Sequence, residues 1–302
     1  MFTALDHIII GVNDLEQAAI TFTQKLGLSV SGGGIHPSGG TANRIIVIGD
    51  TYLELIAVRT PAEAQQSMIK RLAKGDGYLN FVLASNDIMT DAAAMVACGT
   101  TIIGPNPGEL RSSGGRSRAW TRADIERRDL TQHYPFLIEH DSTGEERRFR
   151  LAGWTTPPDH PLGATKILST TIAVENLAEA TQRFQQIYGL QPSAPFSENT
   201  WDASLVSFPL GDGTQHFELA MPTNTNVGES TRCLLEPGAL ADHLQQFGES
   251  LCRMTVVTES LAASRRHLDA HKVMYSYGEK PDPTLWIHPH ETCGAVIVLR
   301  EA

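Results

Sequence analysis

The chain has 302 residues, 41% of them hydrophobic, and a formal net charge of −10. Its length fits one large domain or two ordinary ones, and its acidic balance argues against a nucleic acid or an anionic membrane surface as a partner. No apolar run approaches the roughly 18 residues of a membrane-spanning helix.

A β-branched strand and an amphipathic helix are predicted within residues 5–30, LDHIIIGVNDLEQAAITFTQKLGLSV. Asn13 or Asp14 can cap the helix, and Gly27 follows its last turn. The helix carries its apolar residues on one face, at helical spacing: Leu15, Ala18, Ala19, Phe22 and Leu26.

A glycine-rich loop, GGGIHPSGGTAN, follows at residues 32–43 and carries His36 and Asn43. It is no nucleotide-binding loop, because an apolar strand follows it rather than a helix whose N-terminus could hold phosphate. Its glycines would instead let the loop approach a ligand closely. The apolar strand TYLELIAV, residues 51–58, then holds a single acid, Glu54.

A second, weaker copy of this pattern begins at Tyr78 and aligns Asn80 with His7. It ends in PFLIEHD, which holds Glu139 at the place of the first copy's acid. The loop between, NPGELRSSGGRSRAW, is also glycine-rich and includes Arg118, which could bind a substrate carboxylate bidentately. A solvated loop is the alternative interpretation of that segment.

The second half of the chain repeats the first. After a charged and then proline-rich segment, residues 142–165, residues 167–190 match residues 5–28 at one constant offset. This copy ends in QHFELAMP, and a fourth, weaker copy closes with GAVIVLRE. Six identical pairs carry the match: Val12 and Val174, Leu15 and Leu177, Ala18 and Ala180, Phe22 and Phe184, Gly27 and Gly189, and Leu28 and Leu190.

The repeated unit is a strand, a helix and about three further strands, used four times, which predicts an α+β protein. A single βαβββ unit would leave an open sheet edge and an uncovered apolar face. We therefore expect the units to pair, first with second and third with fourth, into two curved-sheet half-barrels, each around a cup. The predicted domains are an N-terminal pair at residues 1–145, a linker at 146–165 and a degenerate C-terminal pair at 166–302.

These segments resemble the vicinal oxygen chelate superfamily, which includes glyoxalase I, the extradiol dioxygenases and the bleomycin-resistance proteins. The resemblance rests on LDHIIIGVNDL, a helix ending in LGL, and TYLELIAV. More narrowly, HPSGGTANRIIVIGDTYLELIAV and PFLIEHD resemble a glyoxalase-like domain family. The superfamily resemblance implies that the first and last strands of each unit aim side chains into the cup, where a divalent metal often sits.

Carried onto this chain, the resemblance implies His7, Glu54 and Glu139 as ligands of a divalent ion such as zinc, manganese, nickel or iron. Asn80 departs from that pattern, since an amide is a weak ligand, and it could instead hydrogen-bond a metal-bound water or the substrate. His36 could supply a fourth ligand. We expect Glu54 or Glu139 to act as general base. The expected substrate contacts are His36, Asn43, Asn80 and Arg118.

The corresponding positions of the second half make a poor metal site; they are Ser169, Glu218, Arg253 and Val298. His216 lies two residues before Glu218 and so faces the same side of the strand. We expect Arg253 to pair with Glu218, and this half to serve for packing or as a lid.

Each of these residues also has a purely structural interpretation. Glu54 and Glu139 could face solvent at the edge or the end of a sheet. His7 could be a core histidine bonded to a backbone carbonyl. His36 and Asn43 could belong to an ordinary turn.

The chain is expected to be cytoplasmic. Its first residues lack the basic start and the small-residue cleavage site of a secretory signal. The expected partner is a small-molecule ligand, with a homodimer left open. The cysteines are scattered, which predicts reduced thiols rather than a disulfide framework or a zinc site: Cys98, Cys233, Cys252 and Cys293.

The leading functional prediction is a metal-dependent lyase or isomerase acting on a small oxygen-bearing molecule. The metal would chelate two vicinal oxygens and stabilise an enolate as it forms. A ring-cleaving extradiol dioxygenase is the alternative among enzymes, although that chemistry needs two histidines and one carboxylate, and Asn80 replaces the second histidine. The alternative of a different class is a non-catalytic protein that sequesters an apolar or aromatic compound, as resistance proteins do.

Overall fold

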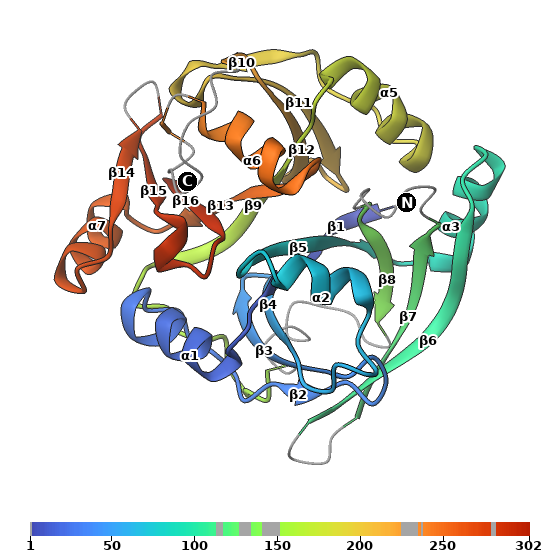
Figure 1. The fold of residues 1–302 in the computed structure, drawn as a ribbon, viewed down its shortest axis with the longest axis horizontal. Helices are drawn as coiled ribbons and strands as arrows, with labels where there is room; N and C mark the ends of the chain where they lie inside the picture. Colours follow the sequence, from blue (N-terminus) through green and yellow to red (C-terminus); the bar gives the residue numbers. More distant parts are fainter. Residues whose placement is uncertain are drawn as a thin grey trace.

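The structure is a computed structural model and describes residues 2–112, 117–126, 134–140, 152–224, 235–236, 238–278 and 282–302. Four units follow one another along the described chain, each a strand, a helix and three strands (Figure 1). The predicted α+β fold of four βαβββ units is therefore confirmed.

The first two units form the N-terminal half. The first contains β1 (Phe2–Gly11), α1 (Leu15–Ile20) continued by the π-helical turn η1 (Thr21–Lys25), β2 (Gly34–Ile35), β3 (Thr41–Ile48) and β4 (Thr51–Val58). The second contains β5 (Gly77–Ser85), α3 (Ile88–Ala97), β6 (Ile102–Ser112), β7 (Ser117–Ile125) and β8 (Phe136–His140).

The last two units form the C-terminal half. The third contains β9 (Ala164–Ala173), α5 (Leu177–Tyr188), β10 (Phe196–Glu198), the 3-10 turn η2 (Asn199–Trp201), β11 (Ala203–Leu210) and β12 (Gln215–Pro222). The fourth contains β13 (Ser250–Thr258), α7 (Leu261–Ala270), β14 (Tyr275–Gly278), β15 (Thr284–Ile287), the 3-10 turn η3 (Pro289–Glu291) and β16 (Val296–Glu301).

The internal repeat extends to the helix ends. The Asp14 side chain accepts a hydrogen bond from the Gln17 N–H and caps α1, and Asn176 caps α5 in the same way. A glycine with positive φ follows each helix, Gly27 at 63° and Gly189 at 66°. Such residues end helices at little steric cost, so the matched offset reflects matched local structure.

The units pair as predicted, but the two sheets close differently. The first sheet is a closed barrel in the order β1-β4-β3-β2-β6-β7-β8-β5, and the second is open in the order β10-β11-β12-β9-β13-β16-β15-β14. The barrel closes because the two-residue strand β2 pairs with β3 on one side and with β6 on the other. A half-barrel was expected in both halves, and the N-terminal one is complete.

One large hydrophobic core contains residues of both sheets and joins them. Alternate residues of β4, such as Leu53 and Leu55, are fully buried in this core, while Glu54 between them faces the other side of the strand. Phe81 on β5 meets Phe217 on β12 with ring centroids 5.6 Å apart. Strands β1 and β4 are buried along most of their length. Burial on both faces explains why their sequences are almost continuous apolar runs.

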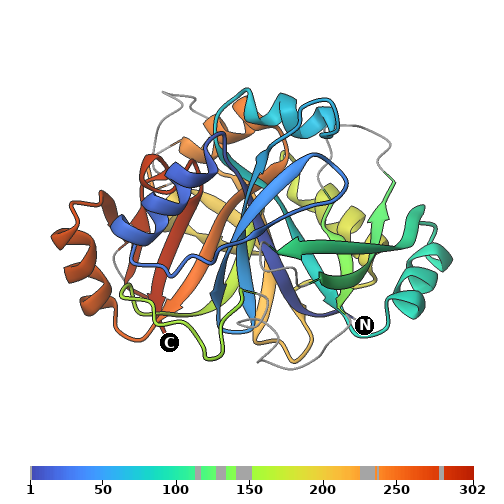
Figure 2. The ribbon, with the colours of Figure 1, turned by 90° about the horizontal axis from the view of Figure 1, so that it is seen from below.

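Two helices outside the four units were not predicted. Helix α2 (Gln66–Leu72) precedes β5, and α6 (Ala239–Phe247) precedes β13. In Figure 1, α2 lies across the ring of barrel strands, and Figure 2 shows it beside α6 of the other half. The Arg71 guanidinium stands 4.3 Å from the centroid of the Phe247 ring, so the two helices touch.

The described part of the predicted linker packs against the barrel. Trp154 lies against a cluster that includes Ile45 and Val47, and Nε2 of His160 is 2.6 Å from the Val47 carbonyl oxygen. We retain residues 146–165 as the proposed boundary between the halves. None of the described helices is long and apolar enough to cross a membrane.

Candidate functional site

A pocket of about 410 Å³ occupies the interior of the N-terminal barrel. This volume lies within the range of small-molecule sites. Its walls come from the barrel strands, from the loop between β2 and β3, and from α2. Its apolar surface includes Ile9, Ile45, Ile56, Leu79, Phe136 and Ile138.

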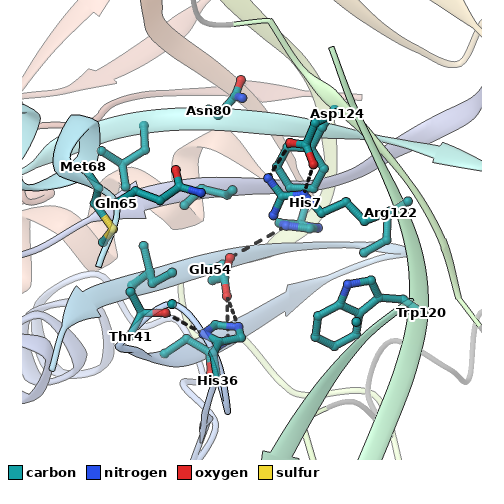
Figure 3. A pocket seen from close by; sticks show the side chains of 18 of the residues that line it. His7, His36, Thr41, Glu54, Gln65, Met68, Asn80, Trp120, Arg122 and Asp124 are labelled. Carbon is teal, nitrogen blue, oxygen red and sulfur yellow. Dashed lines mark hydrogen bonds and ion pairs between the residues drawn. The ribbon is translucent and has the colours of Figure 1, made fainter. Parts of the chain in front are cut away.

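Glu54 lies between two histidines on the pocket wall (Figure 3). Its Oε2 is 3.7 Å from Nε2 of His7, and its Oε1 is 3.6 Å from Nε2 of His36. The Asn43 amide donates a hydrogen bond of 2.6 Å to the same Oε1. Four residues proposed from the sequence therefore meet at one carboxylate.

Strand register explains this convergence. In the parallel pair β1–β4, Glu54 stands opposite Ile9, which is two residues after His7, so His7 and Glu54 share a face. His36 lies just beyond β2, and its Nδ1 is 2.9 Å from the Thr41 hydroxyl at the start of β3. The glycine-rich loop thus folds over the barrel with its histidine held toward Glu54.

Asp6 orients the His7 ring and was missed in the sequence. Its Oδ1 lies 2.7 Å from Nδ1 of His7, and the Asp6 side chain is buried. An ionised carboxylate only accepts hydrogen bonds, so the contact places the ring proton on Nδ1 and leaves Nε2 facing Glu54. His140 was missed as well; its Nε2 lies 3.3 Å from the same Asp6 oxygen. The available signal was adjacency, since each follows or precedes a residue that was singled out.

The opposite wall carries a compensated arginine. Arg122 on β7 donates two hydrogen bonds to Asp124, of 2.7 and 2.6 Å. Its guanidinium also lies 3.7 Å from the centroid of the Phe136 ring. Trp120 lines the same wall (Figure 3), and the wall therefore offers aromatic surface beside an internal ion pair.

The expectation that Glu139 reaches the pocket is corrected by the register of β8. Its Oε2 accepts a 2.7 Å hydrogen bond from the Ile88 N–H at the start of α3, where a carboxylate also meets the positive end of the helix dipole. Ile138 and His140, its neighbours, line the pocket instead. Glu139 therefore lies on the outer face of the barrel.

Phe136 takes the position in the second unit that Glu54 holds in the first. Phe136 stands opposite Val82 in the parallel pair β5–β8, and Val82 follows Asn80 by two residues. Asn80 does line the pocket, but its amide donates to the Tyr134 carbonyl and its oxygen accepts from the Phe81 N–H, each at 2.9 Å. The second unit thus presents a ring and a locally bonded amide.

The described residues do not fit the expected metal centre. They contain no group of three or more His, Cys, Asp or Glu side chains placed to hold an ion. His7 and Glu54 are neighbours, but Glu139 is on the other face of its strand. The Arg118 side chain lies outside the described residues, and its proposed substrate contact stays a prediction.

The second half holds the buried pair of Arg253 and Glu218 that was predicted. Nη2 of Arg253 lies 2.9 Å from Oε2 of Glu218, and the guanidinium stands 4.1 Å from the centroid of the Trp201 ring. Burial raises the pKa of Glu218. The Arg253 charge and hydrogen bonds from His216 and Thr171 lower it by more than that, so that the pKa is about 2. This half holds a fixed salt bridge where the first half holds an open pocket.

Comparison with known proteins connects this geometry to a family. The sequence matches the glyoxalase-like domain over residues 5–188, and it matches no curated protein. A crystal structure of a hypothetical protein from Staphylococcus aureus has a similar fold, with a TM-score of 0.67, 13% identity and 99% of each chain covered. A mutant of 4-hydroxymandelate synthase from Streptomyces coelicolor is also similar, with a TM-score of 0.63, 12% identity, and 99% of this chain and 93% of that one covered. At these identities the two structures show the shared fold alone.

Proposed function

This chain belongs to the glyoxalase-like domain family, and we propose that its N-terminal barrel binds a small oxygen-bearing organic molecule and moves a proton on it. The reaction would be of the isomerase or lyase type. The observation that carries this proposal is the placement of the two Nε2 atoms of His7 and His36 beside the two carboxylate oxygens of Glu54. All three side chains line one pocket.

Glu54 and His7 suit the roles of acid and base. Asp6 accepts a hydrogen bond from the Nδ1–H of His7, so the lone pair of His7 Nε2 faces Glu54 Oε2 and the pocket. These two acceptors are 3.7 Å apart, too far for a direct hydrogen bond, and a donor group of the ligand could reach both of them. A proton on a carbon next to a carbonyl could be taken by one of these groups and returned by the other.

Asn43 and His36 would support that step. Asn43 holds Oε1 of Glu54, which fixes the carboxylate and leaves Oε2 as the oxygen available for proton transfer. His36 is the nearest ring nitrogen on the other side of the carboxylate, where it could donate to the oxygen of a developing enolate. The expected ion bound by His7, Glu54 and Glu139 is not carried into this proposal, because Glu139 does not reach the pocket.

Non-catalytic sequestration is the second candidate. One observation favours it: both oxygens of Glu54 already have neighbours within the protein, and much of the remaining wall is apolar or aromatic. Such a pocket could hold an aromatic compound without changing it. Ring-cleaving dioxygenation would require a metal-binding group that the described residues do not provide.

Proton exchange separates these candidates. The purified protein would be incubated in deuterium oxide with a set of 2-oxo acids and 2-hydroxy ketones, and loss of the proton signal next to the carbonyl would be followed by NMR. We expect the wild type to exchange this proton faster than the protein-free background. Glu54→Gln and His7→Gln should show no exchange above that background. Binding of these compounds without exchange would favour sequestration, and neither binding nor exchange would contradict both candidates.

A further inference from the structure

Arg71 lies at the end of α2 and lines the same pocket as His7 and Glu54. Its side chain is half-buried. Nη1 donates a 2.8 Å hydrogen bond to the Gly75 carbonyl. A side chain at Gly77 would come within 2.5 Å of Nη2, so the glycine leaves the space that the guanidinium fills.

This guanidinium has no carboxylate of its own. Arg122, the other arginine on the described pocket wall, is paired with Asp124, whereas no described acidic group forms an ion pair with Arg71 within 4.0 Å. The nearby Asp76 accepts hydrogen bonds from the backbone and side chain of Asn13, both 2.8 Å long. A half-buried cation without a direct ion-pair partner among the described residues is costly, which suggests that a ligand supplies one.

The C-terminal half holds this cation in place. The Phe247 ring of α6 lies 4.3 Å under the Arg71 guanidinium, a cation–π distance. The next basic residue, Lys74, makes a separate contact: it donates to the Gln246 carbonyl at 2.7 Å and does not line the pocket. Burial lowers the pKa of Arg71 and Asp76 raises it, but an arginine stays charged in either case.

We propose that Arg71 binds the carboxylate group of the substrate, and that Phe247 positions Arg71 for this contact. The inference rests on the proposed function, because it assigns the substrate class of the same pocket: a small organic acid whose other end reaches Glu54 and His7. The planar fork of a guanidinium matches the two oxygens of a carboxylate. One positive charge without a direct partner also matches one carboxylate better than a doubly charged phosphate.

The test compares two probes that differ in charge, phenylacetate and phenylacetamide, by isothermal titration calorimetry. The wild type should bind phenylacetate about ten- to a hundredfold more tightly, the range expected for charge-assisted hydrogen bonds. Arg71→Gln should remove this preference while leaving the affinity for phenylacetamide unchanged, and Arg71→Lys should restore part of it. Phe247→Ala should reduce the preference without abolishing it.

Lys74→Gln is the matched control, because Lys74 carries the same charge three residues after Arg71 but does not line the pocket. It should leave the preference intact. Equal affinity for the two probes in the wild type, or a preference that survives Arg71→Gln, would overturn the assignment of Arg71 while leaving proton exchange on neutral ketones to test the proposed function. Failure of both probes to bind would contradict the inference as well.

Discussion

The Asp6 carboxylate hydrogen-bonds the ring of the very next residue, His7, over 2.7 Å. Successive side chains of a regular strand point to opposite faces, so such a contact needs an irregular strand. The pairing of β1 with β5 does shift its register between Leu5 and His7. A β-bulge of this kind re-aims side chains next to functional sites.

Asp6→Asn should therefore slow proton exchange more than it weakens ligand binding. The asparagine can keep the shape of the contact but no longer requires the proton on Nδ1, so His7 loses its fixed tautomer. We expect a loss of roughly 10- to 100-fold in rate, as for other residues that orient a functional histidine. NMR of the His7 ring nitrogens, alongside the exchange rate, would detect the tautomer change. An unchanged rate in a folded variant would mean that Asp6 has a structural role only.

Glu139→Ala should destabilise the protein and leave the pocket unaffected. The variant removes the acceptor for the Ile88 N–H at the first turn of α3, which is expected to cost about 1–2 kcal/mol of unfolding free energy. Chemical denaturation would measure this loss, and Glu139→Gln should lose less because its amide oxygen can still accept. If Glu139→Ala instead abolished ligand binding at unchanged stability, Glu139 would belong to the site after all.

The difference between Glu54 and Glu139 marks how far the sequence could predict the site. Glu54 is the single acid in an otherwise apolar strand, so alternation separates it from Leu53 and Leu55, and the family resemblance indicates that its face lines the cup. In FLIEH, two polar residues stand side by side at the end of a strand, and alternation then cannot decide between Glu139 and His140. The pairing of Val82 with Phe136 decides it, and that register arises from tertiary contacts.

The fold shows the same division between local and tertiary information. The helices with cap residues and a following glycine, α1 and α5, were predicted. Helix α2 was not, because the residue before it, Gln65, makes no capping hydrogen bond through its side chain and the helix has only seven residues. Its place depends on packing across the pocket and against Phe247, which no local pattern in the sequence reveals.

Glu218→Gln should flatten the acid side of the stability profile. The pKa of Glu218 is held at about 2 in the folded protein, below its usual value of about 4.3. A depressed carboxylate pKa contributes stability that is present above the unfolded pKa and is lost as the pH falls through the folded one. The wild type should therefore lose up to about 3 kcal/mol between pH 5 and pH 2 from this group, and the variant should not.

At pH 7 the same variant should be less stable than the wild type by roughly 3–5 kcal/mol, because Arg253 would stay buried without its main partner. Urea denaturation at several pH values would measure both effects. A parallel acid profile in the two proteins would show that Glu218 is not held ionised by Arg253. Binding to the N-terminal pocket should be the same in both proteins when they are folded.

Asn80→His should create divalent-metal affinity that the wild type has only weakly. Asn80 lines the pocket and stands opposite Ile9 on one side of β1, while Glu54 stands opposite the same Ile9 on the other side, so an imidazole at position 80 would add a nitrogen donor to the donor atoms of His7 and Glu54. The gain should be larger for zinc or nickel than for magnesium, since imidazole suits the former ions. The variant would lose the two hydrogen bonds of the amide, at a cost of about 1 kcal/mol each.

Calorimetry on metal-stripped proteins would measure the gain in metal affinity, with Asn80→Gln as the control that adds no imidazole. A second variant, Asn80→His with Glu139→Gln, should bind zinc as tightly as Asn80→His alone, because Glu139 faces away from the pocket. Loss of affinity in that double variant would return Glu139 to the metal site, and unchanged zinc binding in Asn80→His would leave the pocket as a site for organic ligands.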